Sequence, residues 1–158
     1  DWQRFLLKLN DEKVIDWLLA KTSPTSYLRK DSKLLLDAFQ SKADESFIHQ
    51  LVTRLNIDVN STILSILPMT PLMFYAENGT IKEIEILLKL GAKLEALVED
   101  DGARTKRVPI TEWLQTRKSF NANDKKYIYL LNRHRAEKEQ EILSASLTSS
   151  KNKVSVRV

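Results

Sequence analysis

Residues 70–96 read TPLMFYAENGTIKEIEILLKLGAKLEA, and this stretch decides the fold of the 158-residue chain. Thr70 followed by Pro71 is typical of a helix start, because a threonine oxygen accepts a backbone N–H bond and proline needs no such bond. Gly79 suits a turn between two helices. Gly91 suits the left-handed residue that ends the second helix, where a Cβ would be strained. The stretch therefore predicts a short helix, a tight turn and a longer helix.

The same construction recurs along the chain, with an apolar stripe at helical spacing in each longer helix. We expect short helices at 2–9, 33–40, 71–77 and 109–117, each followed by a longer one at 11–21, 44–55, 80–90 and 123–132. Asp11 and Asp44 are expected to cap two of the longer helices. Matching apolar positions are Leu18, Leu51, Leu87 and Leu130, which gives spacings of 33, 36 and 43 residues. A single pair cannot bury its own apolar face, so neighbouring pairs must stack.

Residues 70–96 closely resemble an ankyrin repeat. Residues 56–60, Asn-Ile-Asp-Val-Asn, are similar to the Gly-Ala-Asp-Val-Asn ending of that family. Asn56 replaces the glycine of this ending, and asparagine is the next best residue in a left-handed conformation. The resemblance covers about residues 2–132 and is specific over 57–96 only. It implies an all-α fold, an ankyrin-like repeat solenoid of stacked helix pairs with extended inter-repeat loops.

The expected organisation is one ankyrin-like repeat domain at 1–143 and a tail at 144–158. The four units of the domain are about 2–32, 33–69, 70–107 and 108–143. In the fourth unit Trp113 stands where a small residue is usual, and we expect it to cover the end of the stack. The tail is rich in Ser and Lys and lacks a core-forming pattern before its last valines, so we expect it to be mobile.

Composition argues against several kinds of chemistry. The chain has no Cys, which removes disulfides, thiolate zinc sites and cysteine nucleophiles. Its three glycines cannot form a Walker A loop or a dinucleotide fingerprint, and His49 and His134 are far apart in the sequence. No run of apolar residues is long enough to span a membrane. We therefore expect no catalytic residue, no metal, no cofactor and no enzyme activity here; an attached catalytic domain outside these residues is left open.

The charge is distributed unevenly. Residues 1–101 carry 12 Lys/Arg against 16 Asp/Glu, whereas residues 102–158 carry 13 against 5. The basic C-terminal third either forms a surface for phosphates, anionic lipid head groups or acidic proteins, or is an ordinary solvated face. The repeat offers no element that reads bases, so we do not expect a nucleic-acid partner.

Ankyrin-like modules bind other proteins with the loops between repeats and with the exposed face of the short helices. On this sequence the resemblance places that face at Phe74, Glu77 and Asn78 in the third unit and at Glu112, Gln115 and Thr116 in the fourth. An exposed aromatic side chain at Phe74 would anchor a partner. The alternative is a slightly rotated helix in which Phe74 lies in the core and Met73 faces outward.

Two connectors are longer than the repeat requires, and we expect both to form fingers. Residues 61–69 are unusually apolar for a loop, so they either cover a neighbouring loop or present an apolar patch at Ile63, Ile66, Leu67 and Met69. In residues 97–108 an acidic half and a basic half flank Asp101-Gly102, a hairpin-turn signal. The halves either pair with each other or steer a charged partner through Arg104, Lys106 and Arg107.

The resemblance thus implies a monomeric protein–protein interaction module whose partner is another protein. Two alternatives stay open: the targeting arm of a larger enzyme, and anion binding by the basic C-terminal third. The Lys-, Asn- and Ile-rich repeats are similar to ankyrin modules of secreted effectors from intracellular bacteria. We accordingly expect a cytoplasmic location, or secretion into a host cell if the source is such a bacterium, and a cytoplasmic eukaryotic scaffold is the other interpretation.

Overall fold

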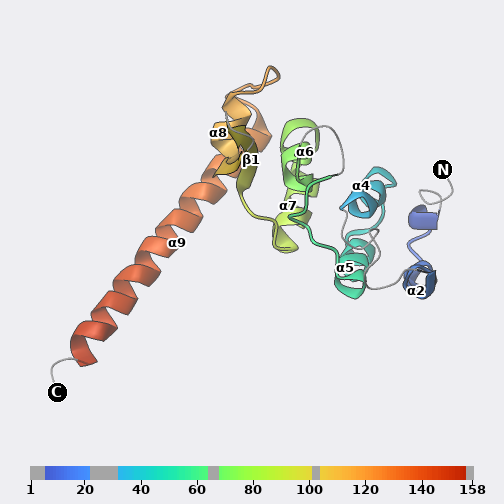
Figure 1. Cartoon of the computed structure of the whole chain (residues 1–158), viewed down its shortest axis with the longest axis horizontal. Helices are drawn as coiled ribbons and strands as arrows, with labels where there is room; N and C mark the ends of the chain where they lie inside the picture. Colours follow the sequence, from blue (N-terminus) through green and yellow to red (C-terminus); the bar gives the residue numbers. More distant parts are fainter. Residues whose placement is uncertain (1–5, 22–31, 64–67, 101–103, 156–158) are drawn as a thin grey trace.

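The computed structural model of the chain describes residues 6–21, 32–63, 68–100 and 104–155. The described helices are α2 (Glu12–Lys21), α4 (Lys33–Gln40), α5 (Glu45–Leu55), α6 (Pro71–Asn78), α7 (Ile81–Lys89), α8 (Ile110–Gln115) and α9 (Lys125–Ser155). Strands β1 (Glu95–Asp100) and β2 (Arg104–Pro109) lie between α7 and α8. The helix pairs follow one another along an elongated molecule, with α2 near one end and the C-terminal end of α9 at the other (Figure 1).

The expectation of an all-α repeat solenoid is wrong, because β1 and β2 form a two-stranded antiparallel sheet. Their register places Leu97 opposite Arg107 and Val98 opposite Lys106. Leu97, Val98 and Val108 pack half-buried against the core. Apolar and β-branched residues on both sides of a turn signal favour paired strands, and the pairing satisfies backbone groups that a plain loop would leave to water. The two charged halves of the connector therefore pair, which is one of the two arrangements expected from the sequence.

The core runs along the molecule between successive helices. Within pairs, α4 packs on α5, α6 on α7 and α8 on α9; between pairs, α2 packs on α5, α6 on α8 and α7 on α9. Leucines at the centres of these contacts are almost fully buried, among them Leu35, Leu51, Leu72, Leu87 and Leu130. Burial of one such side chain contributes about 1.5–3 kcal/mol. Each helix pair therefore depends on its neighbours for stability.

The helix starts follow the predicted signals in part. The Oγ1 atom of Thr70 accepts a bond from the Met73 backbone N–H over 3.3 Å, and Pro71 is the first residue of α6. Asp44 occupies the N-cap position of α5, but its side chain makes no capping bond. Instead the Asp44 N–H donates to Oδ1 of Asn10 over 2.7 Å, which ties this helix start to the preceding unit.

The helix ends confirm the two left-handed positions. Asn56 after α5 and Gly91 after α7 have φ angles of 54° and 91°. Gly79, between α6 and α7, is in extended backbone, and glycine is required there for space instead. A Cβ at Gly79 would lie 2.2 Å from Cδ1 of Tyr75. The same residue type thus serves two different physical needs in one repeat.

Helix α9 is 31 residues long and extends well beyond α8 and the hairpin (Figure 1). The sequence predicts a helix at 123–132 that continues through the mixed charges up to residue 143. The structure continues it to Ser155, so residues of the expected tail are helical. Residues 144–150 are exposed.

Candidate partner-binding surface

The exposed face of α6 is set by how its helix is rotated. Met73 is 2% exposed and lies in the core, as does Tyr75. Phe74 is only partly buried, and its ring packs edge-on against Tyr75 with 5.1 Å between ring centroids. Met73 is therefore the inward residue of the two, and Phe74 is the more accessible one, partly covered by the core.

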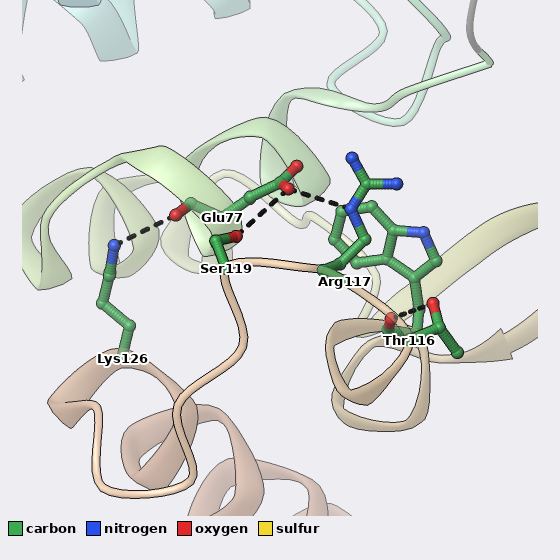
Figure 2. A network of polar contacts seen from close by, with 6 residues as sticks. Glu77, Thr116, Arg117, Ser119 and Lys126 are labelled. Carbon is green, nitrogen blue, oxygen red and sulfur yellow. Dashed lines mark hydrogen bonds and ion pairs between the residues drawn. The ribbon is translucent and has the colours of Figure 1, made fainter.

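Glu77 lies at the centre of a polar network between α6 and the α8–α9 connection (Figure 2). Its Oε1 accepts a bond from Nε of Arg117 over 2.9 Å and from Oγ of Ser119 over 3.4 Å. Nζ of Lys126 donates to the Glu77 backbone carbonyl over 3.3 Å. The Glu77 side chain is only 13% exposed. The sequence places Glu77 on the free face, whereas the structure uses it to join the third and fourth units.

Trp113 contacts Arg117 of the same network through its ring. It is buried, and the Arg117 guanidinium lies 5.1 Å from the centroid of its ring. Oγ1 of Thr116 donates to the Trp113 carbonyl over 2.7 Å and so closes the end of α8 (Figure 2). A guanidinium over an indole face gains electrostatic attraction that a bare ion pair lacks. Arg117 is therefore held by a carboxylate and by a ring together.

The other predicted residues of the short-helix face are accessible. Asn78, Glu112 and Gln115 are all exposed. Nε2 of Gln115 donates to the hydroxyl of Tyr127 over 2.9 Å, which orients the amide toward α9. Together with Phe74 they give an outer surface on α6 and α8 that is polar around one aromatic ring.

The first finger, residues 61–69, is closed at its base. Ile63 and Met69 form an isolated antiparallel bridge, in which the Ile63 N–H donates to the Met69 carbonyl over 2.8 Å. Both side chains are partly buried against the core. The other two predicted contact residues of this finger, Ile66 and Leu67, lie outside the described residues.

The second finger is the β1–β2 hairpin. Arg104, Lys106 and Arg107 on β2 are all exposed. NH1 of Arg107 lies 3.5 Å from Oε2 of Glu95 on the other strand. For Arg104 and Lys106 the described part of the chain contains no ion pair. These two cations are accordingly the charges of the finger that are most available to a partner.

Asn60, for which the sequence pattern predicts no role, connects the bases of the two fingers. Its Oδ1 accepts a bond from the Lys93 N–H over 2.9 Å, and its Nδ2 donates to the Gly91 carbonyl over 3.3 Å. A small depression beside it is lined by Asn60, Thr70, Lys93, Glu95, Leu97 and Arg107. These bonds therefore hold the bases of the two fingers in position relative to each other. The sequence signal for this link is the ending Asp58-Val59-Asn60. Its likeness to the family pattern does not indicate which hydrogen bonds Asn60 makes.

A cleft of about 450 Å³ between the hairpin base and α9 was also missed. His134 lines it with Lys93, Glu95, Arg107, Glu137 and Lys138. Burial lowers the pKa of His134, Lys138 acts in the same direction, and Glu137, Glu95 and a hydrogen bond to the Leu94 backbone oppose it. Nε2 of His134 is buried and has no hydrogen-bond partner among the described residues. The sequence could not indicate this cleft, because it lies where α9 approaches residues 92–95 and 107–109.

The basic residues of the C-terminal third do not form one free patch. Arg117 and Lys126 are both engaged at Glu77. Arg104 and Lys106 lie on the hairpin, whereas Arg133 and Arg135 lie on α9. Phosphate binding by this third of the chain would depend on several cations acting together. With two of them already paired internally, the structure favours that role less than the sequence does.

Comparison with known proteins gives no further guide: no family model, no curated protein and no solved structure matches the chain. In the described ranges no helix is both long and apolar enough to cross a membrane. The same ranges contain no group of three His, Asp or Glu side chains placed to hold a metal ion.

Proposed function

We propose that this chain is a protein-interaction module that binds a partner protein through a surface made of the α6–α8 face and the two fingers. The observation that carries the proposal is the position of Phe74. It is partly accessible between two buried neighbours, on a helix whose start is fixed by Thr70 and whose end is joined to the next unit by Glu77. A partly exposed aromatic ring on a rigid element is typical of an interface anchor.

Internal contacts hold the described parts of this surface. Asn60 fixes the base of both fingers, and the Ile63–Met69 bridge closes the first one. Arg117 fixes α6 relative to α8. Side chains held in this way lose less conformational entropy on binding, so more of the contact energy contributes to affinity. Arg104 and Lys106 extend the same surface with charges that favour a partner carrying carboxylates.

The likeness of residues 70–96 to an ankyrin repeat supports this function, since the family binds proteins with loops and short helices. Helix pairs joined by a hairpin finger are consistent with a divergent member. A cytoplasmic module, free or delivered into a host cell, and the targeting arm of a larger enzyme are both compatible with this surface, because each acts by protein binding.

The test is site-specific photo-cross-linking in a cell lysate, with a photoreactive phenylalanine analogue at one position per variant. Positions 74 and 106 report the proposed surface, and position 85, exposed on α7, is the matched control. One protein captured from positions 74 and 106 and not from 85 supports the proposal. Capture of the same protein only from 85, or of nothing at any position, contradicts it.

A further inference from the structure

Strand β2 is an accessible edge of the hairpin. In the described part of the chain the sheet has only two strands, so each of them has one side that no strand covers. All residues of β2 except Val108 are exposed. In β1, by contrast, Ala96 is fully buried and Leu97 and Val98 are half-buried against the core. An edge strand presents a row of unpaired backbone groups, which is a template for another strand.

The register determines which backbone groups of β2 point outward. The Ile110 N–H donates to the Leu94 carbonyl over 3.1 Å, which continues the β1–β2 ladder by one step. Hydrogen-bonded and non-hydrogen-bonded pairs alternate along antiparallel strands, so the even-numbered residues of β2 bond to β1 and the odd-numbered ones face away. The outward groups are therefore the N–H and C=O of Thr105 and Arg107, and no described residue bonds to them. Pro109 agrees with this assignment, because its missing N–H is on the outward side and costs the ladder no bond.

The charges of β2 select the strand that fits this edge. The strand contains three cations and no carboxylate. Arg104 and Lys106 are two residues apart and so lie on one face of the sheet, and neither has an ion pair among the described residues. Opposite an added antiparallel strand, both would occupy non-hydrogen-bonded positions, where the side chains of two strands are closest. Carboxylates at alternate positions of that strand would pair with both cations, whereas a second basic strand would be repelled.

We propose that the outer edge of β2 is a strand-addition site for an extended acidic segment of the partner protein, with carboxylates opposite Arg104 and Lys106. This inference rests on the proposed function, since it states how the second finger contacts the partner. Backbone bonds at Thr105 and Arg107 supply affinity, and the alternate carboxylates supply selectivity. Lys and Pro on an edge strand also prevent unselective pairing, so the same residues exclude strands that lack the matching charges.

A short acetylated and amidated peptide, Thr-Glu-Thr-Glu-Thr, tests the site on the full chain by NMR. At saturating peptide, hydrogen exchange should slow at the N–H groups of Thr105 and Arg107, whereas that of Lys106, which the register already bonds to β1, should change little. The same peptide with Lys in place of Glu should bind at least about tenfold more weakly, which corresponds to ~1.4 kcal/mol. Unchanged exchange at both outward groups, no binding, or equal binding of the two peptides would overturn the proposal.

Two sets of variants separate the backbone contribution from the charges. Thr105→Pro removes one outward N–H and keeps the ladder to β1, so it should lower the affinity for the acidic peptide at least about tenfold. Thr105→Val keeps that N–H and should bind as the native chain does; equal affinities of the two variants would overturn strand addition. Arg104→Glu with Lys106→Glu, which leaves the backbone intact, should reverse the preference between the peptides, and an unreversed preference would overturn the charge selection.

The captured partner distinguishes this inference from the proposed function. A partner captured from position 74 with the same affinity for the native chain and for Thr105→Pro would overturn strand addition and leave the partner-binding surface standing. Failure to capture any partner from positions 74 and 106 would contradict the proposed function, and the peptide measurements would then decide the fate of the β2 edge on their own.

Discussion

Nε of Arg117 lies 2.9 Å from Oε1 of Glu77, forty residues earlier in the chain, and this pair joins α8 to α6. With the Ser119 and Lys126 contacts to Glu77, it forms the polar junction between the third and fourth units. The Arg117 side chain is 33% exposed and that of Glu77 13%, so the pair is better shielded from water than an ordinary surface ion pair.

Arg117→Ala is expected to lower the free energy of unfolding by about 1–3 kcal/mol, because the largely buried carboxylate of Glu77 loses its charged donor. Urea unfolding followed by circular dichroism measures the change. Lys118→Ala is the matched control, since Lys118 is exposed and adjacent, and it should change stability by less than about 0.5 kcal/mol. Equal effects of the two substitutions would contradict the role given to Arg117.

Asn60→Ala is expected to cost about 1 kcal/mol, because the Lys93 N–H and the Gly91 carbonyl both lose their side-chain partner. Asn60→Asp keeps the acceptor for Lys93 and should cost less. Urea unfolding of both variants, compared with Asn78→Ala at an exposed position, gives the answer. An Asn60→Ala variant as stable as the Asn78→Ala control would show that the fingers do not depend on this link.

The two glycines of the third unit should respond differently to a methyl group. Gly79→Ala would force the Tyr75 ring to move, since its Cβ would lie 2.2 Å from Cδ1, and is expected to cost about 1–3 kcal/mol. Gly91→Ala meets open space but keeps a left-handed backbone, φ +91°, which costs about 1–2 kcal/mol. Gly91→Asn should recover part of this loss, whereas Gly79→Asn should recover nothing. The thermal unfolding midpoints of the four variants distinguish steric crowding at position 79 from backbone strain at position 91.

Stability is expected to depend on the protonation of His134. Because burial lowers its pKa in the folded state, the unfolded chain binds the proton more readily. The contribution of His134 is therefore fully present above its ordinary pKa of about 6.5 and is lost as the pH falls toward the folded-state pKa. Unfolding midpoints measured across this window should fall with pH in the native chain and fall less in His134→Gln. An equal fall with pH in the native chain and in His134→Gln would contradict this role of His134.

The helical part of the fold could be predicted because apolar spacing alone fixes it. Residues 33–40 were expected as a helix and are one, and Asn56 and Gly91 end their helices in the left-handed conformation. Pairing of the two halves of residues 97–108 was one of the two arrangements expected from the Asp101-Gly102 signal, whereas the all-α fold class was wrong. Strand pairing there depends on Leu97, Val98 and Val108 reaching the core, which is a tertiary contact.

The surface was less predictable than the fold. Phe74 and Met73 are adjacent, so a small helix rotation exchanges them, and tertiary packing decides which of the two is buried. Glu77 has the spacing of an exposed residue, yet Arg117 covers it from another unit. The residue pattern within one helix cannot indicate a contact that comes from another unit. The same holds for His134, which is partly buried at the base of a hairpin that lies earlier in the chain.

The most direct measurement is the affinity of the captured partner for Phe74→Asp, by isothermal titration calorimetry, beside the control variant Glu85→Arg on α7. We predict at least about a tenfold loss for Phe74→Asp, as for an interface anchor worth ~1.4 kcal/mol or more, and no loss for Glu85→Arg. An unchanged affinity for Phe74→Asp, in a variant that unfolds like the native chain, would contradict the proposal that this surface binds the partner.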